Sequence, residues 1–96
     1  MKKPIKLRFA SAWDAIEETP EDAESMKLRA RLMMVLQDRL NRESLSQEQI
    51  AKTLGVTQPR ASDLMRGRIV LFSIESLVGL LTRVGLRVEM NVKPAA

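Results

Sequence analysis

The 96-residue chain contains no cysteine, no histidine and no tyrosine. Without cysteine it can form no disulfide and no thiolate nucleophile or zinc site, and a cytoplasmic protein is expected. Without histidine, Ser-His-Asp and Cys-His catalysis and His-ligated metal sites are excluded. Only acids, lysines and hydroxyl side chains remain for catalysis, so we expect no enzyme, no metal site and no cofactor.

Long apolar segments are also missing. The longest apolar run is five residues, Leu32–Leu36, whereas a transmembrane helix needs roughly 20. Lys6 and Arg8 interrupt the first apolar stretch, which is unlike a signal peptide. We therefore expect no association with a membrane.

The formal net charge of +4 is unevenly distributed along the chain. Residues 14–24 include six acids and neither Lys nor Arg, so the rest of the chain carries +10. The acids are Asp14, Glu17, Glu18, Glu21, Asp22 and Glu24. A basic body favours an anionic partner such as nucleic acid, although ordinary charge clustering on a solvated surface explains the same pattern.

Capping residues and glycines predict four main helices. Each helix is expected to follow a Thr or Ser whose hydroxyl group can accept from the first turn. Glycine then ends several of them, because it adopts the left-handed conformation without strain. The expected helices run from Thr19-Pro20 to about Asn41, from Ser46 to Gly55, from Gln58 to Arg66 and from Ser73 to Gly85.

Alternating apolar residues predict a short strand near each end, at residues 5–9 and 86–92. A lone strand leaves backbone groups unpaired, so the C-terminal strand needs a partner. That partner is either the strand at residues 5–9 or the same strand of a second copy of the chain.

The first long helix is expected to have an unusually wide apolar surface. One row is formed by Met26, Ala30, Met33 and Leu40, and a second row by Leu28, Leu32, Val35 and Leu36. Either the N-terminal segment or another subunit is expected to cover the second row.

Residues 47–66 have the pattern of a helix-turn-helix, in which two short helices are joined by a three-residue turn that contains Gly. Ala51 is small where the two helices would cross. The positions expected to be buried are Ile50, Leu54, Val56, Ala61 and Leu64. The remaining side chains of the second helix are polar and are expected to face outward.

These residues resemble the Cro and repressor (XRE) family of helix-turn-helix proteins. Ser46-Gln47-Glu48 and Thr57-Gln58 are similar to the starts of its two motif helices. The wider frame, from Trp13-Asp14-Ala15 to Pro59–Arg68, resembles small HigA-like antitoxins and stand-alone regulators. The resemblance implies an all-α, lambda-repressor-like bundle, here with short flanking strands. It divides the chain into an N-terminal extension (1–20), a DNA-binding domain (21–85) and a C-terminal strand and tail (86–96).

The same resemblance implies a repressor that binds double-stranded DNA as a homodimer at a two-fold-related operator. It also implies the antitoxin of a toxin–antitoxin pair, which would neutralise a basic RelE/HigB-like toxin and repress its own operon. The alternatives are a stand-alone phage-type repressor and an interaction module that neutralises a toxin without binding DNA.

Family roles carried over to this sequence assign a DNA contact to most of the second motif helix. Gln47 would donate to a phosphate, and Gln58 would pair with adenine in the major groove. Arg60 would contact guanine or phosphate, and Pro59 a thymine methyl group.

Arg66 and Arg68 would contact the DNA backbone near the end of this helix. Thr57, Ser62 and Asp63 complete the expected surface. Asp63 either accepts from cytosine or pairs with Arg60 or Arg66 on the helix surface.

A partner-binding role is assigned to Trp13, Asp14, Glu17 and Glu18, where an apolar anchor adjoins acids. In the alternative interpretation, Trp13 covers the second apolar row of the long helix. The acids at positions 21, 22 and 24 would then only complement the helix dipole.

Overall fold

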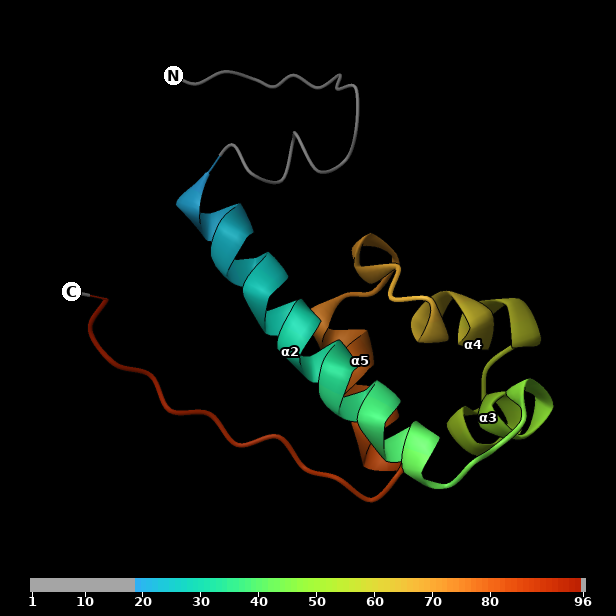
Figure 1. The fold of residues 1–96 in the computed structure, drawn as a ribbon. Helices are drawn as coiled ribbons and strands as arrows, with labels where there is room; N and C mark the ends of the chain where they lie inside the picture. The colour runs from blue at the N-terminus through green and yellow to red at the C-terminus, as the bar shows by residue number, and fades with distance from the viewer. Residues whose placement is uncertain (1–18, 96) are drawn as a thin grey trace, which may run out of the picture.

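The computed structural model describes residues 19–95, and this part of the chain is helical (Figure 1). Its α-helices are α2 (Pro20–Arg42), α3 (Gln47–Leu54), α4 (Gln58–Met65) and α5 (Ile74–Arg83), with a short 3-10 helix, η2 (Ile69–Leu71), before α5. The long α2 packs against α5, while α3 and α4 pack against each other. The predicted all-α class is confirmed. The strand predicted at residues 5–9 lies outside the described residues.

The predicted helix starts are confirmed in detail. The hydroxyl groups of Thr19, Ser46, Thr57 and Ser73 each accept a hydrogen bond from the backbone N–H three residues later, at 3.0–3.3 Å. At α3 the side chain of Gln49 also accepts from the backbone N–H of Ser46 at 2.8 Å, which completes a capping box. Local hydrogen bonding therefore sets where each helix begins.

Gly55 forms the turn between α3 and α4. Its φ of 71° is left-handed, and a Cβ atom built on it would lie 2.8 Å from Nη1 of Arg83. The next residue, Val56, donates its N–H to the carbonyl oxygen of Ala51 at 3.0 Å. Both the left-handed backbone conformation and the nearby Arg83 side chain therefore favour glycine at this turn.

Among the described residues, the core contains no buried polar or charged side chain. The core residues come from every helix: Met26, Met33, Leu36, Leu40, Ile50, Ala51, Leu54, Ala61, Leu64, Ile69, Phe72, Leu77 and Leu81. The helix-turn-helix positions expected to be buried are all included except Val56, which is half-buried. Phe72, which follows η2, is almost fully buried and was not predicted from the sequence.

The second apolar row of α2 is covered only in part by the described residues. Leu36 is buried and Leu32 is half-buried, but Leu28 and Val35 are 48% and 52% exposed. Part of this helix face is therefore left uncovered by residues 19–95.

The predicted C-terminal strand is wrong for the single chain. Residues 86–95 carry no strand, and in Figure 1 they run as an extended segment on the side of α2 away from α3 and α4. A strand requires a neighbouring strand to complete its hydrogen bonds, and no part of the described chain provides one.

Candidate nucleic-acid interface

The starts of α3 and α4 are both exposed. Gln47 and Gln58 are the first residues of these helices, and Pro59 is exposed beside Gln58. Further along α4, Ala61 and Leu64 are buried. The helix therefore packs on the core through one face and presents its first residues to solvent. In this first turn Gln58 keeps its backbone N–H for an anion, since Pro59 has no N–H and that of Arg60 donates to the Thr57 hydroxyl group.

Arg60 is held against the chain that follows α4. Its Nη1 donates to the backbone carbonyl oxygen of Leu71 at 2.8 Å, and its guanidinium carbon lies 3.9 Å from the centre of the Phe72 ring. The side chain is half-buried. Arg60 thus connects the first turn of α4 to η2, and only its remaining N–H groups are available to DNA.

Asp63 pairs with Arg68. The distance from Asp63 Oδ1 to Arg68 Nε is 3.8 Å, and the backbone N–H of Arg68 donates to the carbonyl oxygen of Asp63 at 3.0 Å. The predicted pairing of Asp63 with Arg60 or Arg66 is therefore wrong. It assumed helical spacing, whereas Gly67 turns the chain out of the helix at a φ of 75° and brings Arg68 back over α4.

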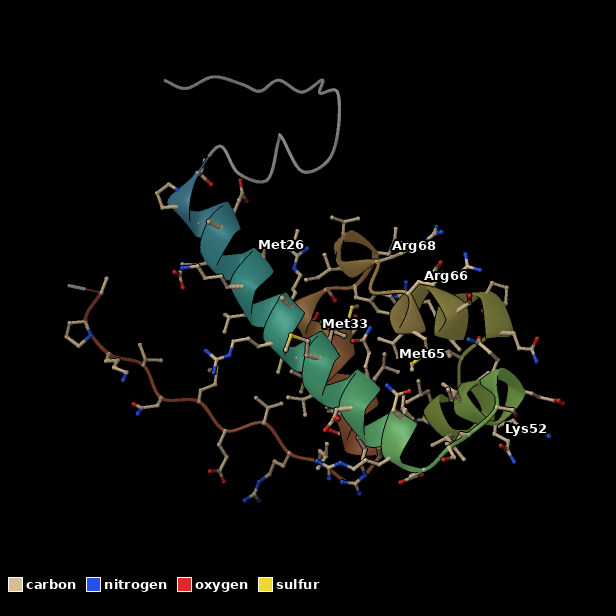
Figure 2. All side chains as sticks on the ribbon, in the orientation of Figure 1. Met26, Met33, Lys52, Met65, Arg66 and Arg68 are labelled. Carbon is tan, nitrogen blue, oxygen red and sulfur yellow. The ribbon has the colours of Figure 1, made fainter. Side chains whose placement is uncertain are left out.

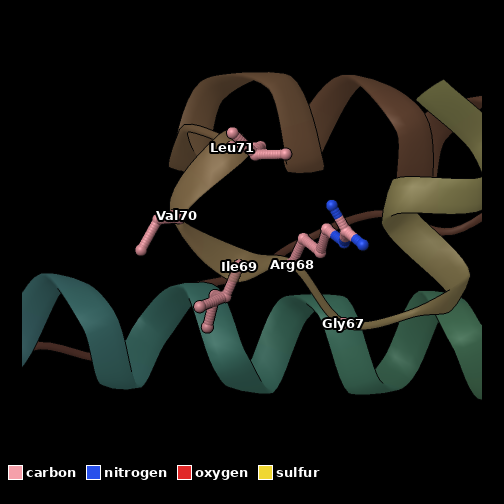
Figure 3. Close-up of a pocket in the computed structure, with 5 residues that line it drawn as sticks. All are labelled: Gly67, Arg68, Ile69, Val70 and Leu71. Atoms are coloured by element: carbon pink, nitrogen blue, oxygen red, sulfur yellow. The ribbon is translucent and has the colours of Figure 1, made fainter. Parts of the chain in front are cut away.

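The short helix η2 after α4 is not predicted by the sequence, although Arg68 before it is. Gly67, Arg68 and η2 line a shallow hollow, shown in Figure 3, in which Ile69 points toward α2. Val70 and Leu71 are exposed on this segment. Ile69 is buried and anchors it, so the segment has a defined position beside α4.

The structure gathers most of the predicted DNA-contacting residues on α4 and its two flanks. Figure 2 shows Arg66 and Arg68 near one another at the end of α4, away from Lys52. Thr57 is exposed before the helix, and Ser62 is half-buried within it. Gln47 is exposed at the start of α3, the helix that packs against α4. The predicted partner-binding residues Trp13, Asp14, Glu17 and Glu18 lie outside the described residues.

Two short helices joined by a glycine turn, the second with an exposed start, define a helix-turn-helix domain. The model of a family described as a helix-turn-helix domain matches residues 15–93. A solved structure described as an XRE family transcriptional regulator is similar, with a TM-score of 0.71 and 34% sequence identity. The similarity covers 76% of this chain and 82% of that one. A search of curated proteins gave no match.

The chain therefore belongs to the XRE-type helix-turn-helix family and is a DNA-binding transcriptional regulator. None of the helices in residues 19–95 is long and apolar enough to cross a membrane.

Proposed function

We propose that the protein is a sequence-specific repressor whose α4 enters the major groove of double-stranded DNA. The observation that carries this proposal is the exposed first turn of α4, held by the Thr57 cap and by the buried Ala61 and Leu64. Gln58 stands at the first position of that turn. Its side-chain amide can donate to N7 and accept from N6 of one adenine, which distinguishes A·T from the other base pairs.

Residues around α4 supply the contacts that position the helix. Arg66 and Arg68 are exposed beyond its last turn, and Gln47 is exposed at the start of α3. These side chains hold phosphates on either side of the groove. Arg60 offers its remaining N–H groups to guanine or phosphate, and Pro59 contacts a thymine methyl group.

The remaining polar residues of α4 have supporting roles. The Thr57 hydroxyl oxygen accepts from the backbone N–H of Arg60, so its hydrogen is free to reach a phosphate. Ser62 contributes a further hydroxyl group. Asp63 neutralises part of the charge of Arg68 and orients it, rather than contacting a cytosine.

The repressor binds its operator as a homodimer, with half-sites about 34–36 Å apart. The open face of α2 and the unpaired C-terminal segment favour self-association, since both expose apolar side chains: Leu28, Val35, Met90 and Val92.

An antitoxin role is favoured by the position of the acidic segment. Glu21, Asp22 and Glu24 are exposed in the first turns of α2, and Figure 1 shows the start of α2 distant from α3 and α4. Acids there would repel phosphate but attract a basic protein. We propose that they extend the partner-binding residues at positions 13–18, and that the protein neutralises a basic RelE/HigB-like toxin encoded beside it. A stand-alone repressor is the alternative.

Titration of the protein's own upstream DNA and of random DNA tests the repressor proposal. Gln58→Ala should weaken binding to the operator by about 1–3 kcal/mol and leave binding to random DNA unchanged. Asn41→Ala, which removes an exposed amide on α2, is the matched control and should change neither. Equal losses on both DNAs for Gln58→Ala would contradict the assignment.

The antitoxin role is tested with the product of the neighbouring reading frame. Replacing Glu17 and Glu18 together by Lys should slow its association with this protein and reduce the salt dependence of binding, because the acidic partner charges are lost. Unchanged affinity, association rate and salt dependence would show that the acidic segment does not bind the partner. If the wild type did not bind the neighbouring product at all, the stand-alone repressor would remain as the function.

A further inference from the structure

The C-terminal segment is an extended chain with no paired strand among residues 19–95, and it has a regular side-chain pattern. Its even-numbered residues are apolar and its odd-numbered residues polar from 86 to 93. Leu86 and Val88 are half-buried against the core, whereas Met90 and Val92 are 80% and 87% exposed. No strand ladder occupies its backbone within the described residues. An extended edge with exposed apolar side chains is a template for another strand.

The open face of α2 adjoins this segment. A Cβ atom built on Gly85 would lie 3.8 Å from Nη2 of Arg39, so the segment starts beside that residue. Leu28, Leu32 and Val35 lie on the same side of α2 as Arg39, at helical spacing. The two incompletely covered apolar surfaces therefore meet on one side of the molecule.

We propose that residues 85–91 pair antiparallel with the same residues of a second copy, with the two-fold axis at Val88. This proposal rests on the proposed two-fold operator binding and names the surface that forms the dimer. Directly opposite residues share one face of a strand pair. Arg87 of each copy then lies opposite Glu89 of the other, and Leu86 lies opposite Met90.

This register is favoured by charge over its neighbours. An axis at either residue next to Val88 places two arginines or two glutamates opposite each other. An axis at Met90 places Arg87 opposite Lys93. The next axis along the chain pairs Glu89 with Lys93, but it brings Pro94, which has no N–H, into the ladder. Only the axis at Val88 combines opposite charges with a complete set of donors.

A second copy fits this surface because the segment is complementary to itself. The exposed Met90 of each copy is placed beside the half-buried Leu86 of the other, at the edge of its core. Within one chain, Nη2 of Arg87 lies 2.9 Å from Oε2 of Glu89, with the side chains 84% and 77% exposed. Both charged groups are thus on the solvent side. There the ion pair within one chain can be replaced by ion pairs between Arg87 of one copy and Glu89 of the other.

Charge-reversal complementation with the full-length chain tests the register. The wild type is expected to sediment as a dimer at tens of micromolar and low ionic strength, where surface charges are least screened. Arg87→Glu alone places two glutamates opposite each other twice, and Glu89→Arg alone does the same with arginines. Each should weaken self-association roughly tenfold or more, since like charges directly opposite are destabilising. An equal mixture of the two variants should restore the dimer as a heterodimer.

Lys93→Glu is the matched control, because it reverses one charge in the same segment but has no strand residue opposite it in this register. It should dimerise like the wild type. All three variants should keep the wild-type circular dichroism, and the wild-type unfolding midpoint at concentrations too low for dimers to form, since the exposed charges lie outside the core.

A wild-type monomer, a mixture that does not recover, or a Lys93→Glu variant as weak as Arg87→Glu would each overturn the proposal. Binding to a single operator half-site distinguishes failure of the proposed dimer surface from failure of the proposed repressor function. All variants should retain half-site binding if only the dimer surface is wrong, whereas the wild type would lack it if the repressor proposal itself failed.

Discussion

The side-chain amide of Gln37 donates a 2.8 Å hydrogen bond to the backbone carbonyl oxygen of Leu64, 27 residues further along the chain. The bond connects the middle of α2 to the last turn of α4. The same carbonyl oxygen also accepts from the N–H of Gly67 at 3.0 Å. Gln37 therefore fixes the end of α4 relative to the longest helix of the domain, and with it the direction in which α4 projects.

Two substitutions of Gln37 should lower stability by different amounts. One only removes the hydrogen bond, and the other places a carboxylate against the carbonyl oxygen of Leu64. Gln37→Met should lower the free energy of unfolding by about 0.5–1.5 kcal/mol, because the carbonyl of Leu64 keeps its bond from Gly67. Gln37→Glu should cost about 1–3 kcal/mol at neutral pH, since a carboxylate cannot donate to a carbonyl. The difference in unfolding free energy between the Glu variant and the wild type should become smaller in acid, where the protonated carboxyl group can donate to the carbonyl oxygen of Leu64. Urea unfolding at both pH values measures it, and equal stability of the two variants would contradict the role.

Removal of the Arg60 side chain should lower stability even without DNA. Arg60→Ala loses the bond to Leu71 and the contact with Phe72, which together are expected to contribute about 1–2 kcal/mol. Arg60→Lys should recover little, because an ammonium lacks the planar fork that makes both contacts. A double-mutant cycle with Phe72→Leu should give a coupling of about 0.5–1 kcal/mol. Additive effects would show that the ring and the guanidinium do not interact.

Alanine at two glycines should have opposite effects. Gly55→Ala should lower the free energy of unfolding by about 1–2 kcal/mol, because an L-residue is strained at a φ of 71°. The nearby Arg83 guanidinium is the flexible end of a side chain and can move away. Gly79 lies within α5, with no atom within 4 Å of an added Cβ. Gly79→Ala should therefore raise stability by up to about 1 kcal/mol. Thermal unfolding checks both, and a neutral Gly55→Ala would contradict a strained turn.

Arg68 should contribute to DNA affinity without contributing to sequence preference. Arg68→Ala should weaken binding to operator and random DNA alike and lower the slope of log K against log salt by about 0.9. Arg42→Ala, which removes an exposed arginine on α2 paired with Asp38, is the matched control and should leave the slope unchanged. A loss confined to the operator would instead assign Arg68 to a base.

The sequence predicts the helices well because their boundaries depend on neighbours in the chain. A hydroxyl group and an N–H three residues apart form each cap, and Gly55 needs only its own backbone freedom to form the turn. The helix-turn-helix core follows from apolar spacing over about 20 residues. All of these are short-range relationships that one sequence contains.

The features that the sequence did not predict depend on contacts between distant segments. Arg60 meets Leu71 and Phe72 only because η2, which packs on α2, brings these residues within reach of its guanidinium group. Asp63 meets Arg68 only because Gly67 reverses the chain. The C-terminal strand fails for a related reason, since alternation records a preference for an extended chain but does not supply the neighbour. The partners of the charged side chains at the interface are therefore harder to predict from the sequence than the positions of the helices.

Different residues of α4 attach the helix to the core and face solvent. Ala61 and Leu64 hold the helix to the core, while Gln58 and Pro59 reach solvent. Exchange of the exposed pair alone should thus retarget the regulator without redesign of its scaffold. If α4 reads DNA as proposed, variants that differ only there would recognise different operators within one cell.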